Sequence, residues 1–190
     1  MRAKVDRNDP ATSLRNATST GFPERGDAVS EALFFGHGLN VVDSKSRLSI
    51  PASLRSTLAA RGSAREVLMG PGHNNRPCLI AYDKGEALRM RDRFQAKHGM
   101  DTSNDVYDEN AELAGYMEEI SIDEAGRFVL NPLLRSYGDL GNHVWFIAGF
   151  NYFELWDPWT FLAQPNLKPQ HRKAILLNLE ARGLPLERPA

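Results

Sequence analysis

The feature that most constrains the fold of this 190-residue chain is an internal repeat about eighty residues long. The segment 39–55 returns as the segment 119–135. Four pairs match by the same shift: Asp43 with Asp123, Arg47 with Arg127, Leu54 with Leu134 and Arg55 with Arg135. Each copy has too little apolar area to close a core alone, so we expect the copies to pair into one small barrel.

Within each copy, local signals predict a β-hairpin, a short helix and a second β-hairpin. Short apolar stretches separated by polar turns predict the strands, and Pro51 and Pro132 stand where helices can begin, since a first helical residue needs no N–H partner. The predicted helices span 52–60 and 133–137. The predicted later strands are 66–69 and 78–82 in the first copy and 143–147 and 152–156 in the second. The fold class is therefore mainly β with short helices.

Five segments follow from these patterns. Residues 1–33 are rich in small polar side chains and predict a flexible N-terminal extension. The two repeats span 34–83 and 116–159. Between them, 84–115 is expected to hold a charged surface helix over 84–98 followed by a solvated acidic linker. The C-terminal tail, 160–190, is expected to hold an amphipathic helix over about 170–182 that docks on a neighbouring chain or on its own barrel.

The net charge of -1 hides an uneven distribution. Residues 31–100 hold 11 basic and 6 acidic side chains, whereas residues 101–125 hold nine acidic side chains and no basic one. Because ionic screening acts over about 8–10 Å, a basic surface keeps its own field beside an acidic one some nanometres away. The overall balance therefore does not exclude a nucleic-acid partner.

Several function classes find no support in the residues. The single Cys78 and five scattered histidines lack metal-ligand spacing, so we expect no metal and no cofactor. No nucleophile motif or phosphate loop accompanies the acidic residues, and we predict that the chain is not an enzyme and has no small-molecule substrate. The apolar runs are too short for a secretory signal or a membrane span, which favours a cytoplasmic protein. The aromatic residues Trp145, Phe146, Trp156 and Trp159 are expected in the core.

The doubled Asp-x-x-x-Arg motif resembles the MraZ family, whose members contain two SpoVT-AbrB-type repeats. The resemblance covers about residues 34–163 and rests on 34–36, 43–51, 77–79, 123–127 and Phe-Asn-Tyr-Phe-Glu-Leu-Trp-Asp at 150–157. It implies a pseudo-twofold swapped-hairpin β-barrel with peripheral helices. One departure is Ser46, because the family pattern has glycine before the first motif arginine.

The resemblance also implies a function. Family members are nucleoid-associated transcription factors that form ring-like homo-oligomers. They bind short direct repeats in double-stranded DNA upstream of their own division and cell-wall operon, which they usually repress. The candidate DNA-binding residues are Lys45, Arg47, Arg55, Arg127 and Arg135.

The alternatives concern the turns and the whole protein. Asp43 and Asp123 are expected to stabilise the turns, and the arginines either contact DNA or pack on the barrel. Since basic residues surround Asp43 while Glu118, Glu119 and Glu124 lie near Arg127 in sequence, we expect the first repeat to carry the DNA-binding face. The alternative function is a scaffold or interaction protein with this fold and no sequence-specific DNA binding.

Overall fold

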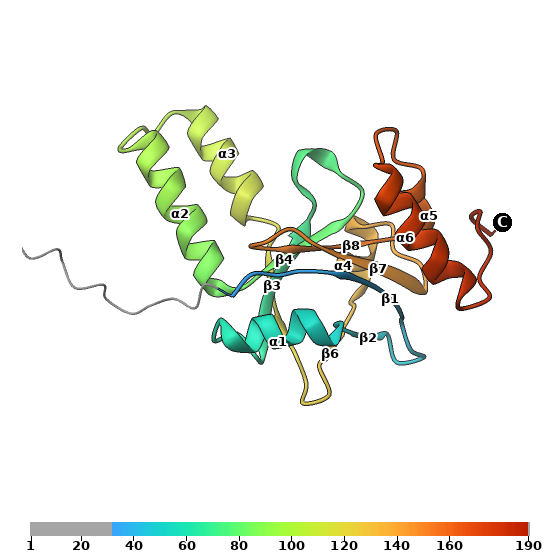
Figure 1. Ribbon diagram of the computed structural model, residues 1–190. Coiled ribbons are helices and arrows are strands. Elements are labelled where there is room, and N and C mark those ends of the chain that lie inside the picture. The colour runs from blue at the N-terminus through green and yellow to red at the C-terminus, as the bar shows by residue number, and fades with distance from the viewer. Residues whose placement is uncertain (1–31, 190) are drawn as a thin grey trace, which may run out of the picture.

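The computed structural model describes residues 32–189 and builds one six-stranded antiparallel sheet from both repeats (Figure 1). The elements of the first repeat are β1 (His37–Val41), β2 (Arg47–Ser49), α1 (Ala52–Ala60), β3 (Glu66–Pro71), a 3-10 turn (His73–Asn75) and β4 (Leu79–Tyr82). Those of the second are β5 (Glu118–Ser121), β6 (Arg127–Val129), α4 (Pro132–Tyr137), β7 (His143–Ala148) and β8 (Phe153–Trp156). The helices outside the repeats are α2 (Lys84–His98), α3 (Asn104–Ala114), α5 (Pro158–Leu162) and α6 (Pro169–Glu180).

The first strand of each repeat pairs with the other repeat. The sheet order is β1-β7-β8-β4-β3-β5, so β1 lies against β7 and β5 lies against β3. The second strands, β2 and β6, pair with each other as a separate two-stranded ribbon. The predicted second hairpins, β3–β4 and β7–β8, are confirmed. The predicted first hairpins are wrong, because the turns after β1 and β5 direct the following strands out of the sheet.

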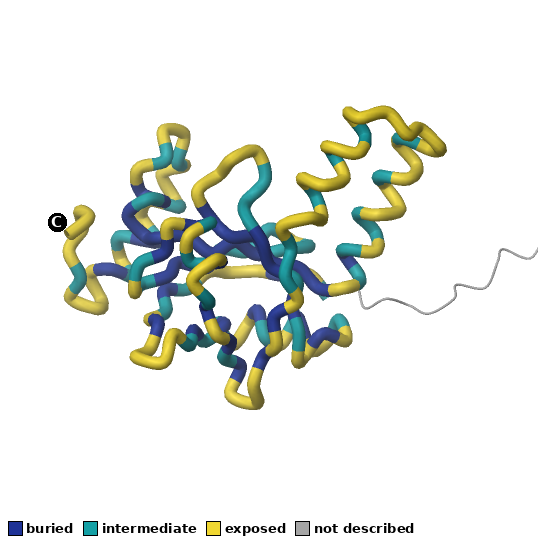
Figure 2. Tube along the Cα trace, turned by 180° about the vertical axis from the view of Figure 1, so that it is seen from behind, coloured by how far each residue is buried: buried dark blue, intermediate teal, exposed yellow. Residues whose placement is uncertain are grey.

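The mainly β fold class is confirmed, whereas the closed barrel is not. Within residues 32–189, the edge strands β1 and β5 are not paired with each other, so the sheet stays open. The ribbon packs on one side through Leu48 and Phe128, which belong to the same buried cluster as Phe146, Phe153 and Leu155. Figure 2 shows the buried chain concentrated in the sheet.

The acidic segment, predicted to be a solvated linker, is partly helical, and its helix buries no residue. Helix α3 forms there and returns along α2, and this helical hairpin extends away from the sheet (Figure 1). Glu109 of α3 accepts a hydrogen bond from Lys97 of α2 at 2.6 Å, and its other carboxylate oxygen lies 2.9 Å from Nε2 of His98. Helix α2 has the bounds predicted for it, because Asp83 caps its first turn and Gly99 ends it with a positive φ.

The C-terminal helix α6 packs on the body of its own chain, which is one of the two expected placements. Ile175 and Leu179 of α6 are buried in a second apolar cluster with Trp145, Trp156 and Trp159. The expectation that these aromatic side chains are core residues is confirmed. The predicted N-terminal extension lies outside the described residues except for 32 and 33.

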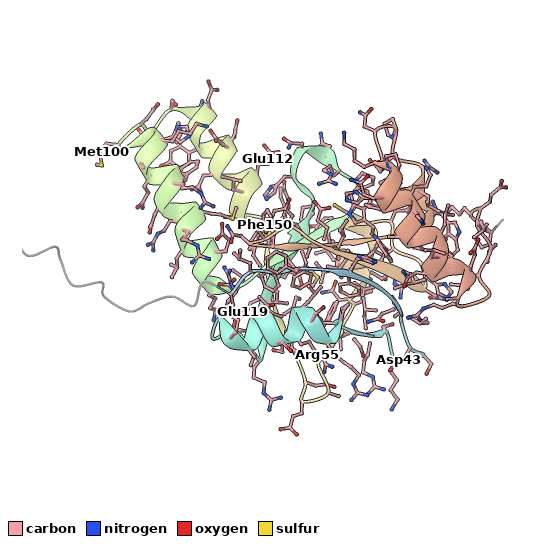
Figure 3. All side chains as sticks on the ribbon, in the orientation of Figure 1. Asp43, Arg55, Met100, Glu112, Glu119 and Phe150 are labelled. Carbon is pink, nitrogen blue, oxygen red and sulfur yellow. The ribbon has the colours of Figure 1, made fainter. Side chains whose placement is uncertain are left out.

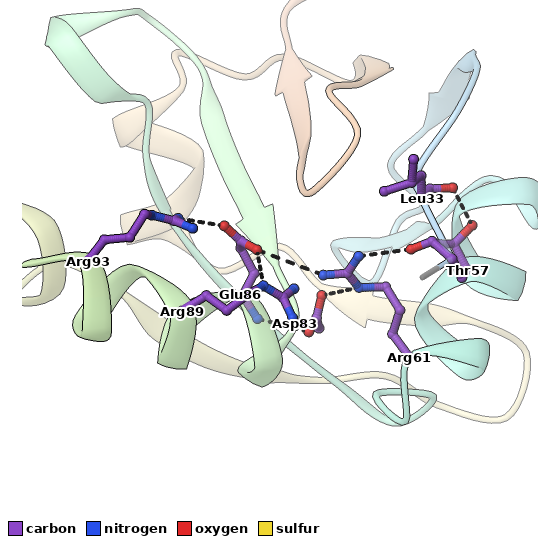
Figure 4. A network of polar contacts seen from close by, with 8 residues as sticks. Leu33, Thr57, Arg61, Asp83, Glu86, Arg89 and Arg93 are labelled. Atoms are coloured by element: carbon purple, nitrogen blue, oxygen red, sulfur yellow. Dashed lines mark hydrogen bonds and ion pairs between the residues drawn. The ribbon is translucent and has the colours of Figure 1, made fainter. Parts of the chain in front are cut away.

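A buried polar network joins the start of the first repeat to α1 and α2 (Figure 4). The side chain of Arg61 is 2% exposed, donates to Asp83 at 2.6 Å and donates to the carbonyl of Ala32 at 2.8 Å. Glu86 accepts from Arg89 and Arg93, each at 2.7 Å. Because a buried charge is costly unless it is paired, these contacts fix how the chain enters β1 and leaves β4.

Candidate nucleic-acid interface

Turn 1, residues 43–46, holds Arg47 through the carboxylate of Asp43. Asp43 Oδ1 accepts the backbone N–H groups of Lys45 and Arg47 at 2.8 and 2.9 Å. Its Oδ2 accepts Nε and Nη2 of Arg47 at 2.8 and 2.7 Å. The Arg47 side chain, then its backbone N–H, lowers the pKa of Asp43 from 3.8 to about 2. The charged pair therefore orients the guanidinium while leaving its remaining N–H groups free to point outward.

Turn 2, residues 123–126, repeats this arrangement. Asp123 accepts the backbone N–H of Arg127 at 2.9 Å, and its Oδ2 accepts Nε and Nη2 of Arg127 at 2.9 and 2.8 Å. The backbone N–H of Arg127, then its side chain, lowers the pKa of Asp123. The expected turn-stabilising contacts of the two aspartates are thus present in both repeats. At the residue before each motif arginine, φ is +56° at Ser46 and +75° at Gly126.

The ribbon of β2 and β6 connects the two turns. Leu48 pairs with Phe128 and both point inward, so Arg47, Ser49, Arg127 and Val129 occupy the outer positions. The ribbon is extended at both ends, because Leu130 donates to the carbonyl of Ser46 at 2.8 Å and Ile50 donates to that of Gly126 at 3.0 Å. The two oriented arginines therefore share one exposed face. Ser49 and Val129 lie on that face too and were not predicted, although the period-2 alternation of a strand indicates them.

The other candidate residues have different surroundings. Lys45 is exposed at the tip of turn 1. Figure 3 labels Asp43 of this turn and Arg55 on the same side of the molecule. Arg55 of α1 reaches turn 2 and donates to the carbonyl of Ala125 at 2.8 Å. Arg135 of α4 donates to the carbonyls of Leu140 and Gly141 at 3.3 and 3.2 Å. The structure thus brings four of the five basic candidates to the turns and the ribbon, and holds Arg135 on the loop after α4.

The acidic residues near turn 2 have partners, which changes the local charge count. Glu124 pairs with Arg65 at 3.0 Å, Glu119 pairs with Lys84 at 3.3 Å, and Glu118 accepts from Asn131 at 2.8 Å. Within the described residues, only Glu124 has a cation of its own, because Lys84 is shared by Glu119 and Glu66 and the amide of Asn131 brings no charge to Glu118. Turn 2 remains less basic than turn 1. Turn 1 has Lys45 where turn 2 has Ala125, and turn 2 has Glu124 where turn 1 has Ser44.

Matching acidic residues at the ends of the two repeats have structural roles. Asp157, which matches Asp83, accepts the backbone N–H groups of Trp159 and Thr160 at 3.1 and 2.9 Å and caps α5. The buried Glu154 pairs with Arg76 and accepts the indole N–H of Trp156 at 2.9 Å. These carboxylates support a helix start and the sheet.

Residues 32–189 offer neither a metal-binding cluster nor a membrane-spanning helix. That part of the chain contains no group of three or more His, Cys, Asp or Glu side chains that could hold a metal ion. None of its helices has the length and apolar character needed to cross a membrane.

Several known proteins that share the same name are similar to this chain. A protein of Escherichia fergusonii named transcriptional regulator MraZ is 30% identical over 150 residues, covering 79% of this chain and 96% of that protein. Proteins of the same name from Citrobacter koseri and Aromatoleum aromaticum are 31% and 32% identical and cover 70% and 65% of this chain. No family model matches the chain.

The strand exchange and the paired Asp–Arg turns define a duplicated protein in which two related β-β-α-β-β repeats complete each other's sheet. Within that class, the chain belongs to the MraZ family of transcriptional regulators. The three relatives are named as regulators and not as enzymes.

Proposed function

We propose that the protein is a sequence-specific DNA-binding regulator whose contact surface is the β2–β6 ribbon with its two turns. The observation that carries this proposal is the pair of aspartate-oriented arginines on one exposed face. The major groove of B-DNA admits a two-stranded β-ribbon, and an arginine held in a fixed direction can donate two hydrogen bonds to a guanine edge. Lys45 supplies a phosphate contact at the tip of turn 1.

The first repeat dominates this contact. Arg47 and Arg127 have nearly equal side-chain exposure, 32% and 36%, so accessibility does not distinguish them. Their neighbours do, because Lys45 adds positive charge beside Arg47 whereas Glu124 adds negative charge beside Arg127. A negative side chain near the phosphate backbone is repelled, and its ion pair with Arg65 only partly offsets this because both side chains are well exposed.

The proposed target is a set of short direct repeats in the promoter region of the protein's own division and cell-wall gene cluster. We propose that the protein represses this gene cluster, and that it acts in the cytoplasm as a nucleoid-associated, ring-like homo-oligomer. One subunit offers few cations, so several subunits on several repeats multiply weak contacts. The exposed aromatic pair Phe35 and Phe150, with rings 5.7 Å apart, supports self-association because large apolar side chains this exposed are typical of interfaces.

A gel-shift titration tests the DNA contact directly. The probe is the upstream fragment with its direct repeats, compared with a scrambled fragment at several salt concentrations. Arg47→Ala is expected to weaken specific binding by roughly 10- to 100-fold, and Arg127→Ala by less. Arg91→Ala is the matched control, because Arg91 is an exposed arginine of α2 paired with Asp92. Equal losses from Arg47→Ala and Arg127→Ala would remove the asymmetry.

The same titration distinguishes the scaffold alternative. Equal binding of the two fragments at every salt concentration would favour an interaction protein that does not read sequence. Oligomeric state is a separate measurement: native mass spectrometry of Phe150→Asp is expected to give smaller assemblies than the wild type. An unchanged assembly would exclude the Phe35–Phe150 surface as the subunit contact.

A further inference from the structure

Arg55 crosses from the first repeat to the second and covers turn 2. It lies on α1, and its Nη1 donates to the carbonyl of Ala125 at 2.8 Å. Its side chain lies so close over Gly126 that a Cβ there would overlap its Cδ and Nη1 and would come within 2.7 Å of its Nε. Gly126 is buried by this contact although it is in a surface turn. Glycine is needed twice at this position, for its φ of +75° and for the space that Arg55 fills.

The guanidinium of Arg55 is directed toward turn 2 through Nη1 and Nε. Arg55 Nε is buried and has no hydrogen-bond partner within the described residues, while Nη1 is committed to a backbone carbonyl. An arginine that contacts phosphate or a guanine edge needs its N–H groups directed outward. Arg55 therefore presents its hydrocarbon stem and part of its guanidinium to turn 2 rather than to a ligand.

The matching arginine does not do this for turn 1. Arg135 corresponds to Arg55 by the repeat, and the exchange of strands would direct it toward Ser46, the counterpart of Gly126. Ser46 carries the Cβ for which the equivalent packing leaves no room. Arg135 instead donates to the carbonyls of Leu140 and Gly141 in its own repeat. Arg55 of the first repeat therefore contacts turn 2, whereas Arg135 of the second repeat does not make the equivalent contact with turn 1.

We propose that Arg55 is a positioning residue that fixes turn 2, and through it the direction of Arg127, and that it does not itself contact DNA. This inference rests on the proposed function for its consequence in DNA binding. Its structural part stands separately, since it concerns the free protein. Turn 1 lacks such a contact and is free to adapt on binding, whereas turn 2 is preorganised.

Hydrogen exchange of the free protein tests the structural part. In Arg55→Met, which keeps a long apolar stem but removes the charge and the donors, the backbone N–H groups of Gly126 and Arg127 are expected to exchange at least about tenfold faster. Those of Ser46 and Arg47 are expected to keep their rates. Arg135→Met is the matched control and should leave both turns unchanged. Unchanged rates in turn 2 of a folded Arg55→Met would overturn the proposal.

The salt dependence of binding tests the functional part. Losing a phosphate contact lowers the slope of log affinity against log salt by about 0.9, whereas losing a positioning residue leaves that slope unchanged and reduces discrimination between the specific and scrambled fragments. We expect the second result for Arg55→Met. A lowered slope would overturn the proposal whatever the exchange rates are.

Two further results distinguish a failure of the proposed DNA binding from a failure of the proposed role of Arg55. If the wild type binds neither fragment, the proposed function fails and the exchange rates alone decide whether Arg55 positions turn 2. If Arg55→Met does not fold, Gly126→Ala gives the same two readouts, because its Cβ displaces the Arg55 side chain and leaves the charge in the protein. Unchanged turn 2 exchange in Gly126→Ala would then count against the proposal.

Discussion

Turn 1 and turn 2 hold the same ion pair in different surroundings. In both, a carboxylate accepts the backbone N–H four residues on and the side chain of that same arginine, with distances that agree within about 0.1 Å. Turn 1 is open and carries Lys45, whereas turn 2 is covered by Arg55 and flanked by the Glu124–Arg65 pair. Local hydrogen bonds therefore form the same motif in both repeats. Side chains from the opposite repeat make the surroundings of the two turns different.

The largest expected effect on stability comes from weakening the β2–β6 ribbon, which connects the two turns. Phe128→Ala deletes a ring that is 2% exposed beneath the ribbon, and we expect a loss of about 3–5 kcal/mol in the free energy of unfolding. Urea unfolding measures it. Val129→Ala on the same strand, where the side chain is 56% exposed, should change stability by less than about 0.5 kcal/mol. Similar values for the two variants would mean that the ribbon does not anchor the turns.

Making turn 2 resemble turn 1 is expected to have the next largest effect. Gly126→Ser places a Cβ where Arg55 lies and puts a side chain at a φ of +75°. We expect a loss of about 1–3 kcal/mol in the free energy of unfolding, because a strained backbone is combined with a displaced arginine. The same denaturant titration checks it. A neutral result would show that Arg55 moves aside without cost.

The two aspartates should respond to acid in the same direction. The folded-state pKa of Asp43 is lowered to about 2 from 3.8, and that of Asp123 is also lowered. A carboxylate with a depressed pKa stabilises the fold above its unfolded pKa, and this contribution is lost as pH falls through the folded pKa. The stability difference between the wild type and Asp43→Asn should therefore be constant above about pH 5 and shrink toward pH 2.

Carbon-detected NMR titration of the carboxyl groups measures both values in one sample. The Asp43 midpoint is expected near 2, with Asp123 also below its ordinary value. A midpoint for Asp43 near 3.8 would contradict the pairing with Arg47.

The smallest expected effect is that of making turn 1 resemble turn 2. Ser46→Gly relieves a serine at a φ of +56°, but glycine also increases the entropy of the unfolded chain. The two terms nearly cancel, so stability should rise by less than about 1 kcal/mol. Comparing its unfolding midpoint with that of Gly126→Ser tests the asymmetry directly. Losses of similar size in both variants would contradict the one-sided role of Arg55.

The parts of the fold that local sequence determines were predictable. Helices α1 and α2 have their expected bounds because Pro51 and Asp83 precede them and glycines at 62 and 99 follow them closely. The aspartate–arginine turns were also predictable, since their contacts lie within five residues. Helix α3 was missed because acidic residues dominate its sequence and it buries no residue, so the seven-residue spacing of Val106 and Leu113 was too weak a signal.

The parts that depend on distant residues were not predictable. Nothing within the first strand of either repeat specifies which repeat it pairs with, because both partners offer the same antiparallel edge. The sequence repeat likewise suggests one role for Arg55 and Arg135. Their different contacts depend on residue 46 or 126 of the opposite repeat, which only the folded arrangement brings near.

The exchange of β1 and β5 has a consequence for how the chain folds and how it can be divided. Each repeat contributes an outer strand to the other, so neither has a complete sheet until both are present. Folding therefore resembles the association of two subunits that are joined by residues 84–115, and its rate depends on how that connection limits their separation. Cutting within this connection should give two fragments that recombine in a concentration-dependent manner, as the halves of a homodimer do.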